Sequence, residues 1–366
     1  MKSIRRLGMA LGTTSLVLGT VTVGATSMAQ TALAASKFHA CVVTDTGGIN
    51  DKSFNHSAWT GAQQAHAMNK NITINYLSST SSADYAPNIQ TFENEGCNLI
   101  VTVGFLMDAA TAAAANANPN QKFAIVDDAP TTKSKNVLAL QYDTNQAAFL
   151  GGYLDAATTK TGVVATYGGM NFPSVAMYMS GFVAGVRYYD KVNKAKVKVL
   201  GFKPGKGVCT LSSCPGTGSF VGNFTDQTAG KTLTTGFFSQ GADLVFPVAG
   251  SVGLGSVAAA KQAGSGHYVT WVDSNGCVSD PTDCKYYNAT VAKGVTASVK
   301  AAILAGAAGT FKGGTYYGTL KNGGTALEIN SAKLTPALKK MLATLTAGIE
   351  SGKISVNPNV YPATPA

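Results

Sequence analysis

The sequence lacks the local signatures of the common enzyme classes. No G-x-G-x-x-G follows the first predicted strand, and neither H-E-x-x-H nor G-x-S-x-G occurs in the chain. The four histidines, His39, His56, His66 and His267, are scattered and form no readable Ser-His-Asp order. A single nucleotide-binding domain with a catalytic annex would need a fingerprint in the first turn, so that alternative has no support. We therefore predict a protein that is not an enzyme, with no catalytic residues and no cofactor.

A basic stripe of the kind that binds nucleic acid is also absent. The 366 residues carry a formal net charge of +10, but the lysines are scattered singly, without a basic stripe or interleaved aromatic rings. Nucleic-acid binding is therefore poorly supported. The charge favours a solvated basic face, and a weak attraction to anionic polymers of the cell surface is the alternative.

The N-terminal segment contains no cysteine. Residues 1–6 include three basic side chains, and residues 7–29 are apolar but interrupted by Gly and Thr. Ala32-Leu33-Ala34 then has the small-x-small pattern of a signal-peptidase site. No basic stop follows the apolar segment, which argues against a membrane anchor. We expect residues 1–35 to be a signal peptide, and without a cysteine we find no site for N-terminal lipidation.

All six cysteines follow this leader, and none has the C-x-x-C spacing of a zinc site. An even number of cysteines in an exported protein favours disulfides. Two pairs would each close a short local loop, and the other two cysteines stand at the heads of strand-like runs that neighbouring parallel strands would bring together. Of the fifteen possible pairings, we favour Cys41–Cys97, Cys209–Cys214 and Cys277–Cys284, with no metal site.

After residue 38 the chain alternates short β-branched runs with Ala-rich stretches, which predicts parallel sheets covered by helices on both faces. The predicted strands are 39–44, 72–77, 98–103, 122–127, 137–141, 162–167, 196–201, 219–223, 243–247 and 268–272. The predicted helices are 56–69, 84–95, 107–117, 145–158, 173–192, 228–239, 253–263, 289–306 and 335–350, with a Gly-rich hairpin at 313–329. Two similar runs of five strands indicate an α/β fold of two doubly wound lobes with a cleft between them.

Candidate ligand residues recur directly after the predicted strands. Ligands of open α/β sheets bind at the carboxyl ends of the strands, so these positions should line the cleft. Taken singly, a Phe at such a position is often part of the core and an Asp is often a helix N-cap. The candidates are Asp45, Phe54, Asn55 and Asp127 (or its neighbour Asp128) in the first lobe, Phe224, Gly250 and Asp273 in the second, and Lys293, one turn into a predicted helix.

Aromatic rings combined with carboxylates and amides suit a flat, polyhydroxylated ligand such as a nucleoside. Phe54 and Phe224, one from each lobe, could sandwich a heterocycle. Asp273 could accept hydrogen bonds from two ribose hydroxyls, because charge-assisted bonds of this kind are strong. Lys293 could donate to a ring nitrogen, a carbonyl or a hydroxyl.

Residues 43–55, Val-Thr-Asp-Thr-Gly-Gly-Ile-Asn-Asp-Lys-Ser-Phe-Asn, closely resemble the opening motif of the BMP family, the basic membrane lipoproteins that include PnrA-like purine nucleoside receptors. Further blocks match in order, among them Val-Gly-Asn-Phe-Thr-Asp at 221–226 and Thr-Val-Ala-Lys at 290–293. The resemblance covers roughly residues 40 to 320. It implies a type I periplasmic-binding-protein fold and a role in capturing substrate for an ABC transporter.

The resemblance also implies roles for the candidate residues. In the family a purine base stacks between two phenylalanines, which match Phe54 and Phe224. An acid and an amide that hold the base match Asp45 and Asn55. The remaining family contacts match Asp127, Gly250, Asp273 and Lys293.

With this fold, we expect lobe 1 at 36–143 plus about 274–312, lobe 2 at 144–273 plus about 313–352, and an extended C-terminal tail at 353–366. The chain departs from the family in three respects. It lacks the N-terminal cysteine through which members are commonly lipid-anchored, it has extra cysteines, and it carries an insertion from Gly205 to Gly218.

From the residues and the resemblance together, we predict an exported, monomeric solute-binding protein at the cell surface, in the periplasm or secreted. It would capture a nucleoside, specifically a purine nucleoside, and deliver it to the permease of an ABC transporter, its link to the membrane. One alternative is a binding protein for another small polar ligand such as a sugar. The other is a secreted surface-associated protein whose charge binds cell-wall polymer.

Overall fold

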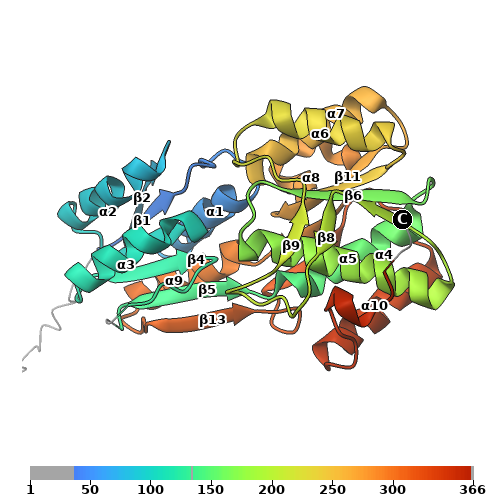
Figure 1. Ribbon diagram of the computed structural model, residues 1–366. Coiled ribbons are helices and arrows are strands. Elements are labelled where there is room, and N and C mark those ends of the chain that lie inside the picture. The colour runs from blue at the N-terminus through green and yellow to red at the C-terminus, as the bar shows by residue number, and fades with distance from the viewer. Residues whose placement is uncertain (1–36, 133–134, 364–366) are drawn as a thin grey trace, which may run out of the picture. The chain divides into compact units, whose positions relative to one another are not determined.

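The computed structural model describes residues 37–132 and 135–363. The predicted signal peptide, residues 1–35, lies outside these ranges. None of the helices within them is both long and apolar enough to cross a membrane. Two six-stranded sheets organise this part of the chain, and each is covered by helices on both faces (Figure 1).

The first sheet is entirely parallel, in the order β13-β5-β4-β3-β1-β2. The order reverses between β1 and β3, and ligands of doubly wound sheets bind at such a point. The strands are β1 Phe38–Thr44, β2 Ile72–Ser78, β3 Leu99–Val103, β4 Lys122–Val126, β5 Val137–Tyr142 and β13 Gly314–Gly318.

Neighbouring residues of β1 serve opposite faces of this sheet because side chains alternate along a strand. Val42 belongs to the core with helices α1 and α9, whereas Val43 belongs to the core with α2 and α3. With both faces covered, the strands are near-continuous apolar runs. The helices are α1 Phe54–Met68, α2 Tyr85–Asn94, α3 Asp108–Ala117 and α9 Val295–Ala307.

The second sheet has the order β14-β12-β11-β10-β6-β7, with β14 antiparallel and the order reversing between β6 and β10. Helices α6 and α7 cover one face, and α4 and α5 cover the other (Figure 1). The strands are β6 Val163–Gly168, β7 Lys198–Leu200, β10 Leu244–Val248, β11 Tyr268–Asp273, β12 Tyr287–Lys293 and β14 Thr325–Ile329. The helices are α4 Thr144–Thr158, α5 Pro173–Asn193, α6 Gln227–Ser239, α7 Gly253–Ala263, α8 Gly276–Ser279 and α10 Pro336–Glu350. The predicted α/β fold class is confirmed.

The segment after Tyr286 differs from the sequence prediction. A single helix was expected over 289–306, but residues 287–293 form the buried strand β12, and α9 begins only at Val295. All seven residues of β12 are buried, so the strand shows no polar alternation that would separate it from the helix that follows. Lys293 is therefore the last residue of a strand and not a helical residue.

The Gly-rich segment 313–329 is not a hairpin, because β13 pairs with β5 in the first sheet and β14 pairs with β12 in the second. The second segment of lobe 1 therefore runs from about residue 295 to the end of β13, whereas the sequence predicted about 274–312. The expected strand 219–223 is reduced to an isolated bridge between Gly168 and Phe220. The chain thus crosses between the lobes after β5, after β12 and after β13.

Three disulfides join Cys41 to Cys97, Cys209 to Cys214, and Cys277 to Cys284, the same pairs that the sequence favoured. The Cys209–Cys214 bridge closes a loop between two short antiparallel strands, β8 Phe202–Pro204 and β9 Gly216–Gly218.

The described part of the C-terminal tail, up to residue 363, packs against the second lobe. Tyr361 is buried against Phe149 and Tyr188. Asn359 Nδ2 donates to the carbonyls of Gly205 and Gly207, which ties the tail to the insertion.

Candidate functional site

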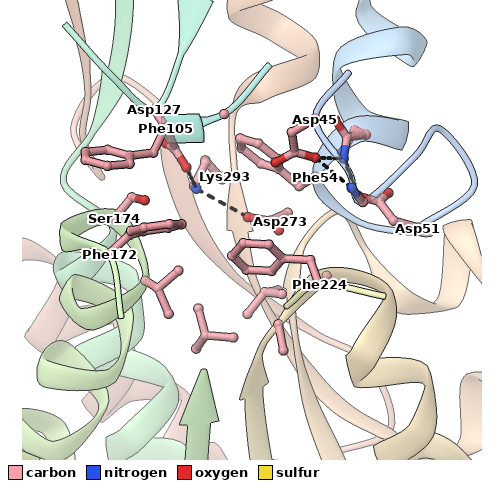
Figure 2. Close-up of a pocket in the computed structure, with 18 of the residues that line it drawn as sticks. Asp45, Asp51, Phe54, Phe105, Asp127, Phe172, Ser174, Phe224, Asp273 and Lys293 are labelled. Carbon is pink, nitrogen blue, oxygen red and sulfur yellow. Dashed lines mark hydrogen bonds and ion pairs between the residues drawn. The ribbon is translucent and has the colours of Figure 1, made fainter. Parts of the chain in front are cut away.

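A cavity lies at the carboxyl ends of the strands of both sheets, where the two strand orders reverse (Figure 2). It is lined by loops after β1, β3 and β4 of the first lobe, by the corresponding edge of β6, β10 and β11 of the second, and by the end of β12. The structure brings together all eight ligand residues expected from the sequence, namely Asp45, Phe54, Asn55, Asp127, Phe224, Gly250, Asp273 and Lys293.

One end of the cavity, here called the loop end, consists of Asp45, Asp51 and Asn55 from the segment between β1 and α1. Asn55 Nδ2 donates to Asp45 Oδ1 at 2.8 Å and to Asp51 Oδ2 at 3.2 Å. Asp51 also accepts from the backbone N–H groups of Ser53, Asn55 and His56, at 2.8–3.0 Å. Because the first N–H groups of a helix have no intrahelical partner, Asp51 caps α1 and fixes Asn55 beside Asp45.

The loop end consists of two acids and an amide, and none of its three side chains is cationic. Asp45, Asp51 and Asn55 are 5%, 2% and 1% exposed. Burial raises the pKa of Asp51 to about 7 and also raises the pKa of Asp45, although hydrogen bonds from Asn55 and Gly47 oppose the latter shift. Asn55 Oδ1 is buried and accepts no hydrogen bond from the residues that the structure describes. Such an orphaned acceptor marks a position where a ligand donor would be stabilising.

The opposite end, here called the lysine end, consists of Asp127, Asp273 and Lys293. Lys293 Nζ lies 2.5 Å from Asp127 Oδ2 and 3.5 Å from Asp273 Oδ1, and its side chain is 3% exposed (Figure 2). Asp273 also accepts from Ser53 Oγ at 2.7 Å and from Tyr178 OH at 3.0 Å. Burial alone would lower the pKa of Lys293, but the carboxylates of Asp127 and Asp273 outweigh it and raise the pKa, so the lysine stays charged.

Asp127 and Asp273 both adopt left-handed backbone conformations, with φ of 67° and 64°. Non-glycine residues rarely occupy this region, and each such residue costs on the order of 1–3 kcal/mol. Each directly follows or ends a central strand, β4 or β11. These two strained positions direct both carboxylates to Lys293, so the backbone strain lies at the lysine end of the cavity.

Aromatic rings form the remaining walls. The Phe54 ring lies with its centroid 4.8 Å from Lys293 Nζ, a cation–π distance. Phe105 stacks on Phe172 with centroids 4.8 Å apart, and Phe172 lies 6.3 Å from Phe224 (Figure 2). Since Phe105 belongs to lobe 1 and Phe172 to lobe 2, this stack joins the two lobes across the cavity.

Glycine is required next to Phe224. A Cβ at Gly169 would overlap the ring of Phe224, so only glycine leaves room for the ring in its observed position. Gly250, at φ 54°, occupies the left-handed region beside Phe224. The glycines therefore shape the wall that carries the ring.

Hydrogen bonds also join the lobes beside the cavity. The carbonyl of Lys52 accepts from Ser274 Oγ at 2.8 Å and from Trp271 Nε1 at 3.3 Å, and Ser53 Oγ donates to Asp273. Lys52 and Ser53 come from the first lobe and their partners from the second. The two lobes are thus in contact, and the cavity lies between them.

Several lining residues were not among the sequence candidates. Asp51 and Phe105 lie within stretches that follow β1 and β3, so the rule of carboxyl ends could have included them. Phe172 and Ser174 follow β6 in the same way. Tyr178 lies within α5 and reaches Asp273 only through tertiary packing, so nothing in the local sequence marks it.

The described residues contain one grouping of side chains of the kinds that bind metals, His39 with Cys41 and Cys97. The two cysteines form a disulfide, so the grouping offers no thiolate.

Two lobes built on mainly parallel sheets, three crossings between them and a cavity of rings and carboxylates at the strand ends define the type I periplasmic-binding-protein fold. A family profile, described as "ABC transporter substrate-binding protein PnrA-like", matches residues 38–203 and 218–352. The chain belongs to this Bmp family, which confirms the resemblance drawn from its motifs. The family is one of substrate-binding proteins and not of enzymes. The unmatched residues 204–217 coincide with the insertion that holds Cys209 and Cys214.

Relatives among characterised proteins agree with this assignment. The chain is 31% identical over 333 residues to the ABC transporter nucleoside-binding protein BmpA of Lactococcus lactis subsp. cremoris, covering 87% of this chain and 88% of that protein. It is 29% identical over 231 residues to basic membrane protein A1 of Borrelia garinii subsp. bavariensis, covering 63% and 62%.

A solved structure of an ABC transporter solute-binding protein from Aeropyrum pernix K1 superimposes with a TM-score of 0.74 at 24% identity, covering 87% of this chain and 92% of that one. At this identity the likeness concerns the fold.

Proposed function

We propose that this protein captures a purine nucleoside in the cavity between its lobes and delivers it to the permease of an ABC transporter. The observation that carries the proposal is the composition of the cavity: aromatic rings between two separate polar ends. A nucleoside is complementary to this arrangement, because it has a flat, hydrogen-bonding heterocycle at one end and a polyhydroxylated ring at the other. The relative in Lactococcus lactis is named a nucleoside-binding protein, which supports the proposal.

The proposed roles follow from the geometry. Phe54 and Phe224 stack on the two faces of the base, because aromatic rings prefer offset stacking. Asp45 and Asn55 accept hydrogen bonds from the base at the loop end. At the lysine end Asp273 accepts from ribose hydroxyls through lone pairs that Ser53 and Tyr178 leave free, while Lys293 keeps Asp127 and Asp273 oriented.

Enclosure of the ligand strengthens these interactions. Polar contacts weaken in water and gain strength in a site of low dielectric constant. Contacts such as Ser53 to Asp273 require both lobes, so the ligand would favour the closed arrangement that a permease could recognise. We further propose that the protein acts as a monomer after export, at the cell surface, in the periplasm or secreted.

The first test is mass spectrometry of small molecules released when the purified protein is denatured. We expect a purine nucleoside. Calorimetric titration of ligand-free protein with nucleosides, free bases and sugars provides the second measurement. Binding of sugars without nucleosides would support a different small polar ligand. Salt-sensitive attachment to cells without any small ligand would support a surface-associated protein.

Phe224→Ala tests the stacking role. We expect nucleoside affinity to fall by about 1–3 kcal/mol, because that is the contribution of one base–aromatic stack. Tyr76→Ala, at a half-exposed ring that packs on Trp59 in lobe 1, is the matched control and should leave affinity unchanged. An unchanged affinity in Phe224→Ala would remove this residue from the site.

A further inference from the structure

The loop end of the cavity offers hydrogen-bond acceptors and almost no donors. Asn55 Nδ2 carries two hydrogens, and both are used, one by Asp45 Oδ1 and one by Asp51 Oδ2. The backbone N–H of Gly47 also donates to Asp45 Oδ1, at 2.9 Å. Asn55 is the only one of the three loop-end side chains with N–H groups, and neither of its two hydrogens is left for a ligand.

The orientation of the Asn55 amide follows from this network. Rotating the amide by half a turn would place Oδ1 against two carboxylate oxygens, an arrangement of acceptors alone, so the network assigns nitrogen to that position. Oδ1 consequently points elsewhere and remains buried without a partner, in a side chain that lines the cavity. Asp45 Oδ2 likewise accepts no hydrogen bond within the described part of the chain, and lies close to Gly104.

We propose that these two free acceptors, Asn55 Oδ1 and Asp45 Oδ2, select a base edge with two neighbouring N–H donors, as in guanosine, over an edge that presents a ring acceptor, as in adenosine. The inference rests on the proposed function and names the preferred class of base within it. Guanine presents N1–H beside its 2-amino group. Adenine presents an amino group beside the lone pair of N1, which would face a carboxylate oxygen.

The nearby cation does not relieve this mismatch. Lys293 Nζ is engaged by Asp127 and Asp273 at the lysine end. An adenine N1 at the loop end therefore meets no donor, and sites that hydrogen-bond a specific group discriminate strongly against analogues that leave buried polar atoms unpaired.

Protonation of Asp45 is the route by which adenosine can bind. Burial raises the pKa of Asp45, and the carboxylate of Asp127 raises it further. Asp51 from the same loop and the phenol of Tyr85 from α2 also face Asp45 and interact with its charge. A protonated Asp45 would donate to adenine N1, so adenosine should bind more tightly as the pH falls, whereas guanosine should not.

The experiment is calorimetric titration of the full mature protein, freed of ligand, with guanosine, inosine, 1-methylguanosine and adenosine at pH 8 and pH 5.5. At pH 8 we expect guanosine to bind about 100-fold more tightly than adenosine, because one charge-assisted hydrogen bond is lost and one acceptor is left unpaired. Inosine, with one donor, should lie between them. 1-Methylguanosine should bind as poorly as adenosine.

Two variants separate this selectivity from general damage. Asp45→Asn introduces a donor in place of the free oxygen and should bring the guanosine-to-adenosine ratio close to one. Asp273→Asn, at the lysine end, should weaken both nucleosides by a similar factor and leave their ratio intact.

Adenosine binding as tightly as guanosine at pH 8, or an unchanged ratio in Asp45→Asn, would overturn the inference while leaving the proposed function standing. Failure of every nucleoside to bind would instead remove the proposed function itself.

Discussion

The two polar ends of the cavity each bury a pair of carboxylates, but only one of them contains a cation. At the lysine end Asp127 and Asp273 flank Lys293. At the loop end Asp45 and Asp51 share only the amide of Asn55 and a few backbone N–H groups. Both ends are almost completely buried, so desolvation acts on both.

The difference shows how one cavity can combine a fixed part with a responsive part. The lysine end is compensated internally, because Lys293 lies against both Asp127 and Asp273. The loop end carries charge that is only partly compensated by hydrogen bonds, so a proton or a ligand donor is stabilising there. In our proposal the fixed end positions the ligand, and the responsive end discriminates between ligands.

Replacing the cation should produce the largest effect. We expect Lys293→Met to lower the free energy of unfolding by about 3–5 kcal/mol, because it leaves two carboxylates buried without a countercharge. Urea denaturation monitored by circular dichroism measures this change. The double variant Lys293→Met with Asp127→Asn should recover part of the loss. An unfolding free energy equal to that of the parent protein would show that the lysine end is not electrostatically coupled.

The contribution of the loop end to the free energy of unfolding should depend on pH. The folded-state pKa of Asp45 and that of Asp51 are raised, the latter from 3.8 to about 7. An acid with a raised pKa in the folded state stabilises the protein at pH values below its unfolded-state pKa. This stability is lost as the pH rises through the folded-state pKa. Ligand-free protein should therefore be less stable at pH 8 than at pH 5, and the buried Asp155, with a pKa of about 7, adds to the same slope.

Asp45→Asn isolates the contribution of the loop end to that slope. We expect it to raise the free energy of unfolding at pH 8 by on the order of 1 kcal/mol and to have little effect at about pH 2.5, below the ordinary pKa of 3.8, where the parent residue is protonated in both states. The amide preserves an acceptor for Asn55 and Gly47. Equal destabilisation at both pH values would contradict an uncompensated charge at this end.

Most of the residues that form the two ends were expected from the sequence. The apolar runs predicted β1 to β5 of the first lobe to within one residue at each end, although they did not predict β13. The rule that ligands bind at the carboxyl ends of strands gathered the candidate residues other than Lys293, which was placed in a predicted helix, without any contact information. The candidates include Asp45 and Asn55 of one end and Asp127, Asp273 and Lys293 of the other.

What the sequence could not provide depends on tertiary pairing. The strand β12 is buried on both faces, so it merges with α9 into one apolar run, and Lys293 was assigned to a helix. β13 and β14 are neighbours in sequence but pair with different sheets, which no local pattern distinguishes from a hairpin. The absence of a cation at the loop end depends on where Lys293 lies in space, so the contrast itself required the structure.

The smallest predicted effect concerns the stack of Phe105 on Phe172, which joins the two lobes across the cavity. Phe105 and Phe172 come from different lobes, so Phe172→Ala should favour opening and speed ligand dissociation by roughly three- to tenfold, the equivalent of an aromatic pair worth about 0.5–1.5 kcal/mol. Stopped-flow fluorescence measures this rate. Phe105→Ala should speed dissociation by a similar factor. Ligand should dissociate from the double variant only slightly faster than from either single variant, because both substitutions remove the same interaction. Because neither ring belongs to the loop end, the guanosine-to-adenosine ratio should stay constant in these variants. A changed ratio would mean that closure, and not the loop end alone, contributes to the discrimination between bases.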